Sequence, residues 1–160
     1  MKQQQNQSKP VHNSREQRQS TSQSNNNQTV DIVDAIVTTI DGLEDGLKTY
    51  PIRDLVQHAE DFGPYLKQQR LETNQIRKFL DAVNRLKADL TEKEDFTKIE
   101  TEVVLLKPKL AYAAARQKAA KPLSKVMSAA IDKVHSGEDF ERLVQLIESI
   151  IDYHKAEGGK

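Results

Sequence analysis

The stretch TNQIRKFLDAVNRLKADL, residues 73–90, decides the fold class of this chain. Its apolar residues recur at intervals of three or four positions, as on one face of a helix, and not at the alternating positions of a strand. These residues are Ile76, Phe79, Leu80, Val83, Leu86 and Leu90. Thr73 is a favourable N-cap residue, so we expect it to be the N-cap of this helix.

Apolar stripes with the same spacing lie on both sides of this stretch and predict further helices. They run over residues 33–47, 55–62, 96–114, 123–134 and 140–151. No strand pattern competes with them, and the low content of aromatic residues, Gly and Pro also favours helices. The sequence therefore predicts an all-α fold, a compact bundle of about five or six helices with short connections.

Proline and glycine mark the interruptions that we expect within this pattern. Pro51 and Pro122 suit the first turns of their helices. We expect residues 63–64, Gly-Pro, to break or kink the second helix, and Pro108 to kink a long fourth helix by removing a backbone hydrogen bond. The polar segment 91–94 is expected to form the turn before that fourth helix.

The N-terminal segment differs from the rest of the chain in composition. Residues 1–28 are rich in Gln, Asn and Ser, and Val11 is the only aliphatic residue after Met1. Such a tract cannot bury enough apolar area to offset its ordering entropy, so we predict a disordered tail, with an assembly or aggregation element as the alternative. The helical domain is then expected over residues 29–160. Residues 1–29 carry a net charge of +3 in a chain that is neutral, so any basic patch must be local.

Several classes of function find no support in the residues. The chain has no cysteine, and none of its four histidines lie at metal-ligand spacing, so we expect no metal and no cofactor. No nucleophile motif is visible, so we expect no catalytic residue; a hydrolase with an unrecognised carboxylate site is the least favoured alternative. His154 lies in the apolar stripe of the last helix, and we interpret it as a half-buried packing residue with satisfied hydrogen bonds.

No apolar run is long enough to cross a membrane. The N-terminus has a lysine but lacks the apolar segment of a secretory signal. A cytoplasmic location is therefore the default expectation.

The stretch LLKPKLAYAAAR, residues 105–116, holds the main candidate binding residues. When Leu110 is placed at the centre of the buried face, a rotation of ~100° per residue brings one set of residues to the opposite side. This set is Lys98, Leu105, Lys109, Tyr112 and Arg116, while Lys107 flanks the buried face. Lys and Arg bind phosphate, and Tyr can stack on a base or pack on a sugar, so the face suits an RNA backbone. The alternative is a solvated helix face without a specific partner.

Two further cations lie near the start of the helix at 73–90. Arg77 and Lys78 follow its first residues, where positive charge opposes the helix macrodipole. The position suits binding of an anion beside free backbone N–H groups. The alternative is an intrahelical ion pair between Arg77 and Asp81.

Three segments together carry a resemblance to a known family. They are LETNQIRKFLDAV at 71–83, LLKPKLAYAAAR at 105–116 and ESIIDYHKAEGG at 148–159. In this order and spacing, residues 30–159 resemble the small helical subunit of the type III-A CRISPR effector complex. The resemblance implies that several copies line up along the backbone subunits, beside the duplex of guide RNA and target RNA. It also implies that this subunit is not a nuclease.

The resemblance and the basic face agree on one function, a non-catalytic structural subunit in antiviral defence that binds the RNA backbone. Its expected partners are the guide RNA–target RNA duplex, the backbone and large subunits, and further copies of itself, including a possible dimer when free, but no membrane. Because base pairing supplies sequence recognition in such complexes, the protein needs to read only backbone shape. The predicted RNA-binding residues are Arg77, Lys78, Lys107, Lys109, Tyr112, Arg116 and Lys155. The alternative is a helical protein–protein interaction module that binds an acidic partner without RNA.

Overall fold

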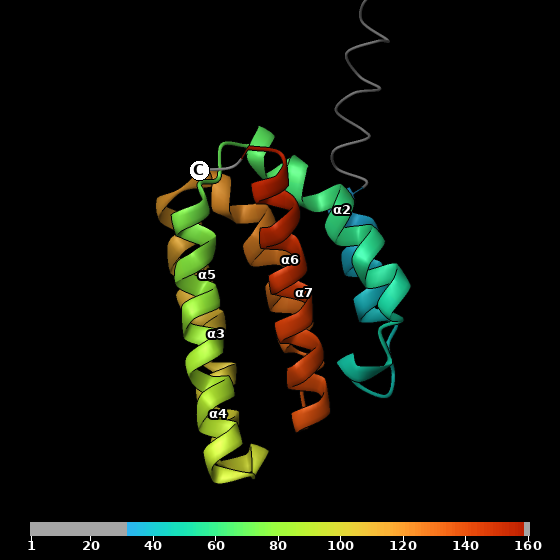
Figure 1. Ribbon diagram of the computed structural model, residues 1–160, viewed down its shortest axis with the longest axis vertical. Helices are drawn as coiled ribbons and strands as arrows, with labels where there is room; N and C mark the ends of the chain where they lie inside the picture. The colour runs from blue at the N-terminus through green and yellow to red at the C-terminus, as the bar shows by residue number, and fades with distance from the viewer. Residues whose placement is uncertain (1–31, 159–160) are drawn as a thin grey trace, which may run out of the picture.

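A computed structural model describes residues 32–158 of the chain (Figure 1). The predicted tail at 1–28, and residues 29–31 and 159–160 of the predicted domain, lie outside this range. Within residues 32–158 all regular elements are helical and none is a strand, which confirms the predicted all-α class.

The described elements begin with a helix over 32–41, followed by the 3₁₀ helix η1 at Leu47–Thr49. The long helices are α2 at Ile52–Gln68, α3 at Thr73–Lys93 and α7 at Gly137–Ala156. The shorter helices are η2 at Phe96–Lys98, α4 at Glu100–Val104, α5 at Leu106–Arg116, η3 at Lys118–Ala120 and α6 at Lys121–Ile131.

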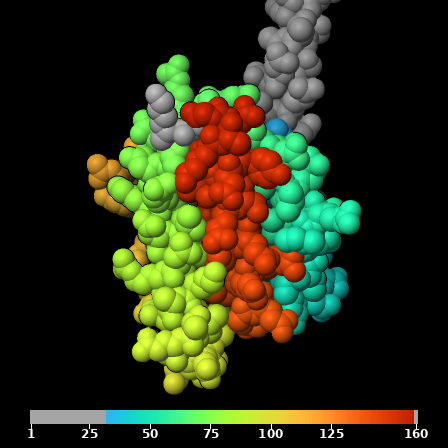
Figure 2. Space-filling view, viewed as in Figure 1, coloured from blue at the N-terminus to red at the C-terminus, as the bar shows by residue number. Residues whose placement is uncertain are grey.

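Helix α7 is the central element of the packing. It lies between α2 and α3 and contacts both, while α5 packs on α6 (Figure 1). Figure 2 shows that α2, α7 and α3 share one face of the molecule, with α7 in the middle. The α5–α6 pair therefore completes the bundle beside α3.

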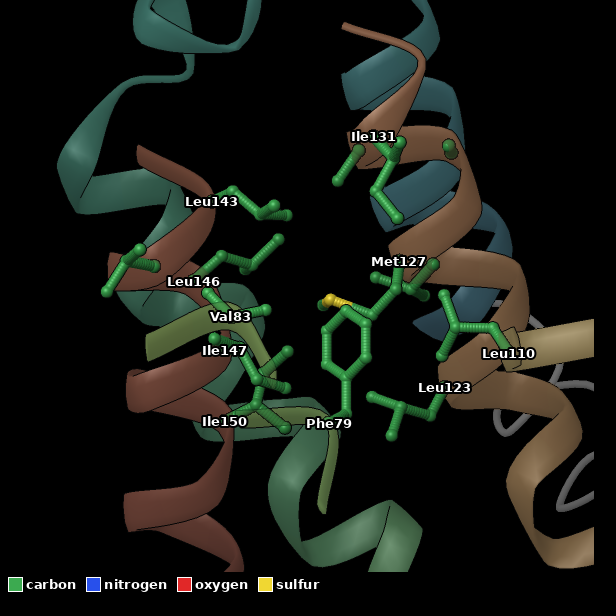
Figure 3. Close-up of a cluster of buried hydrophobic side chains, with 14 of the residues drawn as sticks. Phe79, Val83, Leu110, Leu123, Met127, Ile131, Leu143, Leu146, Ile147 and Ile150 are labelled. Carbon is green, nitrogen blue, oxygen red and sulfur yellow. The ribbon is translucent and has the colours of Figure 1, made fainter. Parts of the chain in front are cut away.

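The core forms where α3, α5, α6 and α7 meet, as Figure 3 shows. Four of the six apolar residues in the stretch 73–90 are buried, and Leu80 and Leu90 are partly buried against them. The side chains that meet them include Leu110 from α5, Met127 from α6 and Ile147 from α7. Burial of such side chains removes apolar area from water, the main favourable term in folding. The helical stripe read from this stretch is therefore confirmed as the face of α3 that packs in the core.

The predicted break at residues 63–64 is wrong, because α2 continues through both residues to Gln68. A Cβ atom built on Gly63 would lie 2.7 Å from the backbone nitrogen of His154 and 2.9 Å from the carbonyl carbon of Tyr153. The glycine thus lets the backbone of α2 lie directly against that of α7. This packing outweighs the backbone hydrogen bond that Pro64 cannot donate.

The ends of α3 also differ from the prediction. Glu72, and not Thr73, is the N-cap residue, and the backbone N–H of Glu72 donates to Oε1 of Gln75 at 3.0 Å. Thr73 is instead buried as the first helical residue. At the other end, α3 extends through residues 91–93, so the expected turn is confined to Glu94 and its neighbour, with a φ of 54° at Glu94.

The long fourth helix predicted from residue 96 onward is divided into η2, α4 and α5. The division between α4 and α5 falls at Leu105, three residues before Pro108. Pro108 is therefore the third residue of α5, where backbone N–H groups have no partner within the helix. The interruption directly follows Val104, whose carbonyl oxygen would accept from residue 108 in a continuous helix. Pro108 cannot donate this hydrogen bond, so the helix is interrupted where the sequence predicted a disturbance.

His154 is fully buried, and not half-buried as the sequence suggested. Its Nε2 lies 2.7 Å from the carbonyl oxygen of Leu71, which can only accept, so Nε2 carries the hydrogen. Its Nδ1 lies 3.4 Å from the hydroxyl of Thr73. The imidazole therefore joins α7 to the start of α3, and its hydrogen bonds are satisfied as predicted.

Tyr50 provides a test of the core through its pH dependence. Its side chain is fully buried, with Oη 2.6 Å from Nδ1 of His58. Burial, with a smaller effect of the Asp54 charge, raises the pKa of Tyr50 well above its ordinary value. The folded protein thus keeps the phenol neutral while the unfolded chain ionises at about pH 10. The stabilisation is present below that pH and is lost as the pH rises, by at most about 1.4 kcal/mol per pH unit.

We therefore expect Tyr50→Phe to weaken the decline in the free energy of unfolding above about pH 10. Urea titrations between about pH 9 and pH 11 would measure this slope. Tyr112→Phe, at a side chain that is 64% exposed, is the control and should keep the wild-type slope. If the free energy of unfolding fell with pH equally steeply in Tyr50→Phe and in the wild-type protein, the raised pKa of Tyr50 would be contradicted.

Candidate nucleic-acid interface

Helix α5 has one buried and one exposed face, in the positions that the helical rotation predicts. Leu106 and Leu110 are 2% and 7% exposed and pack in the core. Lys109, Tyr112 and Arg116 lie on the exposed side of the helix. The Tyr112 side chain is 64% exposed, so most of its surface is accessible to a partner.

Tyr112 and Arg116 form a pair one helical turn apart. Nη1 of Arg116 donates to Oη of Tyr112 at 2.8 Å, and the guanidinium carbon lies 5.6 Å from the centre of the ring. A guanidinium near an aromatic ring is attracted by the negative charge of the ring face. The pair presents a cation and an aromatic ring together on the exposed side of α5.

A groove of about 640 Å³ lies between α3 and α5. Lys78 of α3 lines it together with Lys109 and Arg116 of α5, so the fold brings together candidates from two distant segments. Most of the remaining lining is apolar: Leu71, Phe79, Ala82, Leu106, Leu110, Ala113, Ala120 and Leu123. No carboxylate lines the groove. The groove is therefore apolar inside and cationic at its sides.

The three cations of the groove have no internal counter-charge in the part of the chain that the structure describes. The ion pairs found there are Lys107 with Asp132 and Lys125 with Asp34, and neither includes a groove residue. Uncompensated cations around a concave surface attract anions, because the low-dielectric walls focus the field. The groove is thus suited to a negatively charged ligand.

Lys107 differs from the other candidates on α5. Its ammonium group contacts Oδ1 of Asp132, the C-cap residue of α6, and its side chain is 34% exposed. The pair joins α5 to the end of α6 and reduces the positive charge that Lys107 offers to a partner. Lys107 therefore serves packing of the two helices, and its RNA contact remains a prediction.

The other predicted residues lie outside the groove. Arg77 and Lys155 are exposed, but neither lines it. Within residues 32–158, Arg77 forms no ion pair with Asp81, the alternative considered from the sequence. Lys98 belongs to the separate helix η2, so the helical rotation of α5 does not extend to it.

Two groove residues were missed in the sequence. The side-chain amide of Gln75 on α3 donates to Oε1 of Gln117, the C-cap residue of α5, across one end of the groove. The two glutamines are 42 positions apart. Glutamine is common on exposed helix faces, so no signal in the sequence pairs them. Their contact depends on how α3 and α5 pack.

Metal binding and membrane insertion were also considered for the described region. No group of three or more His, Asp or Glu residues within 32–158 is placed to hold a metal ion. His154, the histidine in the core, is fully buried and held by hydrogen bonds to the protein. None of the helices in this range combines the length and apolar content that a membrane span requires.

Comparison with known proteins connects this geometry to a family. The family model for Csm2 of type III-A matches residues 49–160, which include every element from α2 to α7. Searches among curated proteins and among solved structures gave no match. The match covers more than two thirds of the chain and all residues of the groove. The chain therefore belongs to the Csm2 family, the small helical subunit of the type III-A CRISPR effector complex.

Proposed function

We propose that this chain is a non-catalytic subunit that binds the sugar–phosphate backbone of the guide RNA–target RNA duplex in the type III-A complex. The observation that supports it is the set of cations around the groove, Lys78, Lys109 and Arg116, without carboxylates in the lining. Its partners are the backbone and large subunits of the complex and neighbouring copies of itself along the duplex. The complex acts in the cytoplasm in antiviral defence.

The charge distribution of the chain agrees with this role. The whole chain is neutral, so it has no general affinity for polyanions, and its positive charge is local. A subunit repeated along a duplex needs only a few phosphate contacts per copy, because the assembly supplies avidity. A-form duplexes present phosphates and 2′-hydroxyls at their surface, and these can be contacted without reading the sequence. Arg77 and Lys155 can add phosphate contacts beside the groove.

The test measures how the affinity of the assembled complex for target RNA depends on salt. Each phosphate contact contributes roughly one unit to the slope of log K against log salt concentration. We expect Lys109→Ala/Arg116→Ala to flatten this slope by roughly one to two units per copy that contacts the duplex.

Lys48→Ala/Arg53→Ala is a control matched in residue type. Both residues are exposed, and they lie in η1 and α2, across α7 from the groove (Figure 1). This control should keep the wild-type slope. An unchanged slope in the Lys109/Arg116 variant would reject the RNA contact. If that variant also lost a protein subunit of the complex, the acidic protein partner would become the better interpretation.

A further inference from the structure

We propose that the groove between α3 and α5 binds one unpaired nucleotide of RNA, with the base on the apolar floor and the phosphate at the cationic sides. This inference rests on the proposed function, since Lys109 and Arg116 serve both. It adds a ligand to the site, because a contact with a duplex backbone uses only the phosphates and sugars. The base of a paired nucleotide stays inside the duplex and cannot reach the floor.

The shape of the groove goes beyond what phosphate binding requires. Its volume of about 640 Å³ continues inward from the cations to an apolar floor. Phe79 of α3, Leu110 of α5 and Leu123 of α6 form this floor and lie next to one another in Figure 3. A phosphate group would leave the apolar floor in contact with water, whereas a flat base would cover it. Covering apolar surface is favourable in proportion to the area removed from water.

The exposed pair on α5 supports the same ligand. Tyr112 and Arg116 both line the groove, and both side chains can stack on a base. Their mutual contact holds the ring and the guanidinium beside the opening before a ligand arrives. Proteins that bind single strands without sequence preference combine such stacking platforms with cations along the backbone.

The amides of Gln75 and Gln117 supply the polar end of the groove. The Gln75 carbonyl accepts from the backbone N–H of Glu72 and its amide donates to Oε1 of Gln117. The side-chain NH₂ group of Gln117 can still donate to an acceptor atom on the edge of any base. This predicts binding with little base preference. An acidic helix from a protein would share the charge and would also cover the apolar floor, but a flat base in addition uses Tyr112 and Arg116 as stacking groups beside that floor. The groove therefore favours a nucleotide over a peptide.

The variant that tests the site is Ala113→Phe in the full chain. Ala113 is exposed and lines the groove on α5, so a phenyl ring there fills the space without removing a cation. The probes are a single-stranded RNA with a central 2-aminopurine, the same strand fully paired, and the same strand with abasic central nucleotides. Stacking of one base contributes about five- to tenfold or more to affinity. We expect Ala113→Phe to weaken binding of the intact single strand about tenfold and to change binding of the duplex less than about twofold.

The abasic strand should bind wild-type protein about as weakly as the intact strand binds Ala113→Phe. The fluorescence of 2-aminopurine should change when the strand binds wild-type protein but not when it binds Ala113→Phe, whose groove is filled. Ala111→Phe, the same change on the exposed side of α5 away from the groove, should behave as wild type. Equal affinity of wild-type protein for intact and abasic strands would overturn the nucleotide site. Because the phosphates are still present, the salt slope would then remain, and the proposed function would stand. If RNA binding by the wild-type protein did not depend on salt concentration, the proposed function itself would be rejected.

Discussion

Gly63→Ala is expected to lower the free energy of unfolding by about 3 kcal/mol, although the same change inside an ordinary helix stabilises by about 0.5–1 kcal/mol. The new Cβ would lie 2.7 Å from a backbone nitrogen of α7. A side chain could rotate away from this contact, but a helix backbone cannot. Helices α2 and α7 would have to separate along their shared interface.

Chemical denaturation monitored by circular dichroism would measure this change. Gly137→Ala is the control, because a Cβ there would meet only Cδ2 of Leu90, at 3.7 Å, an ordinary van der Waals distance. Gly137 is also the first residue of a helix, α7. The control should change stability by less than about 1 kcal/mol. If Gly63→Ala were as stable as the control, the close approach of α2 and α7 would be wrong.

Asp139→Ala is expected to destabilise the protein to a similar extent, by about 3 kcal/mol or more. Asp139 is 3% exposed, and its carboxylate accepts from the backbone N–H groups of Lys48 at 2.8 Å and His135 at 2.9 Å. Its oxygens lie next to Gly46, where a Cβ would approach to 2.5 Å. The carboxylate thus ties η1 and the segment before α7 to the first turn of α7. Hydrogen bonds to a charged group contribute about 1.5–3 kcal/mol each, and both N–H groups would lose their partner.

Urea unfolding of Asp139→Ala and of Asp152→Ala would test this role on one helix. Asp152 is exposed near the other end of α7 and forms no ion pair within residues 32–158, so its removal should have little effect. Asp139→Asn keeps the size of the side chain but turns one acceptor into a donor facing an N–H group, so it should also destabilise. A loss below about 1 kcal/mol for Asp139→Ala would show that η1 and the segment before α7 keep their positions without the carboxylate.

The helical stripe at 73–90 and the two faces of α5 could be predicted because they depend on local periodicity alone. Residues three and four apart share a helix face whatever lies around them, so Leu110 and Lys109 fall on different sides. The errors have one common source. The break expected at Gly63 is absent because of the contact with α7, and the N-cap expected at Thr73 is displaced where Thr73 is buried beside His154; local rules do not include these contacts.

The candidate site also has features that the sequence predicted and features that depend on helix packing. The sequence identified Lys78, Lys109, Tyr112 and Arg116 as separate cationic and aromatic positions. It could not place Lys78 opposite Arg116, find the glutamine pair at the end of the groove, or show that Lys107 is held by Asp132. These are relations between helices that are distant in the chain.

The amino-acid sequence by itself determined that this protein is all helical, that one side of residues 105–116 is cationic, and that it belongs to the Csm2 family. Only the tertiary structure decided that three cations surround one apolar groove and that Gly63 allows a close contact between the backbones of α2 and α7. The physical reason is the separation along the chain of the residues that decide each feature. Helix formation and helix faces follow from neighbours within four residues, whereas a groove exists only after α3 and α5 have packed on a shared core.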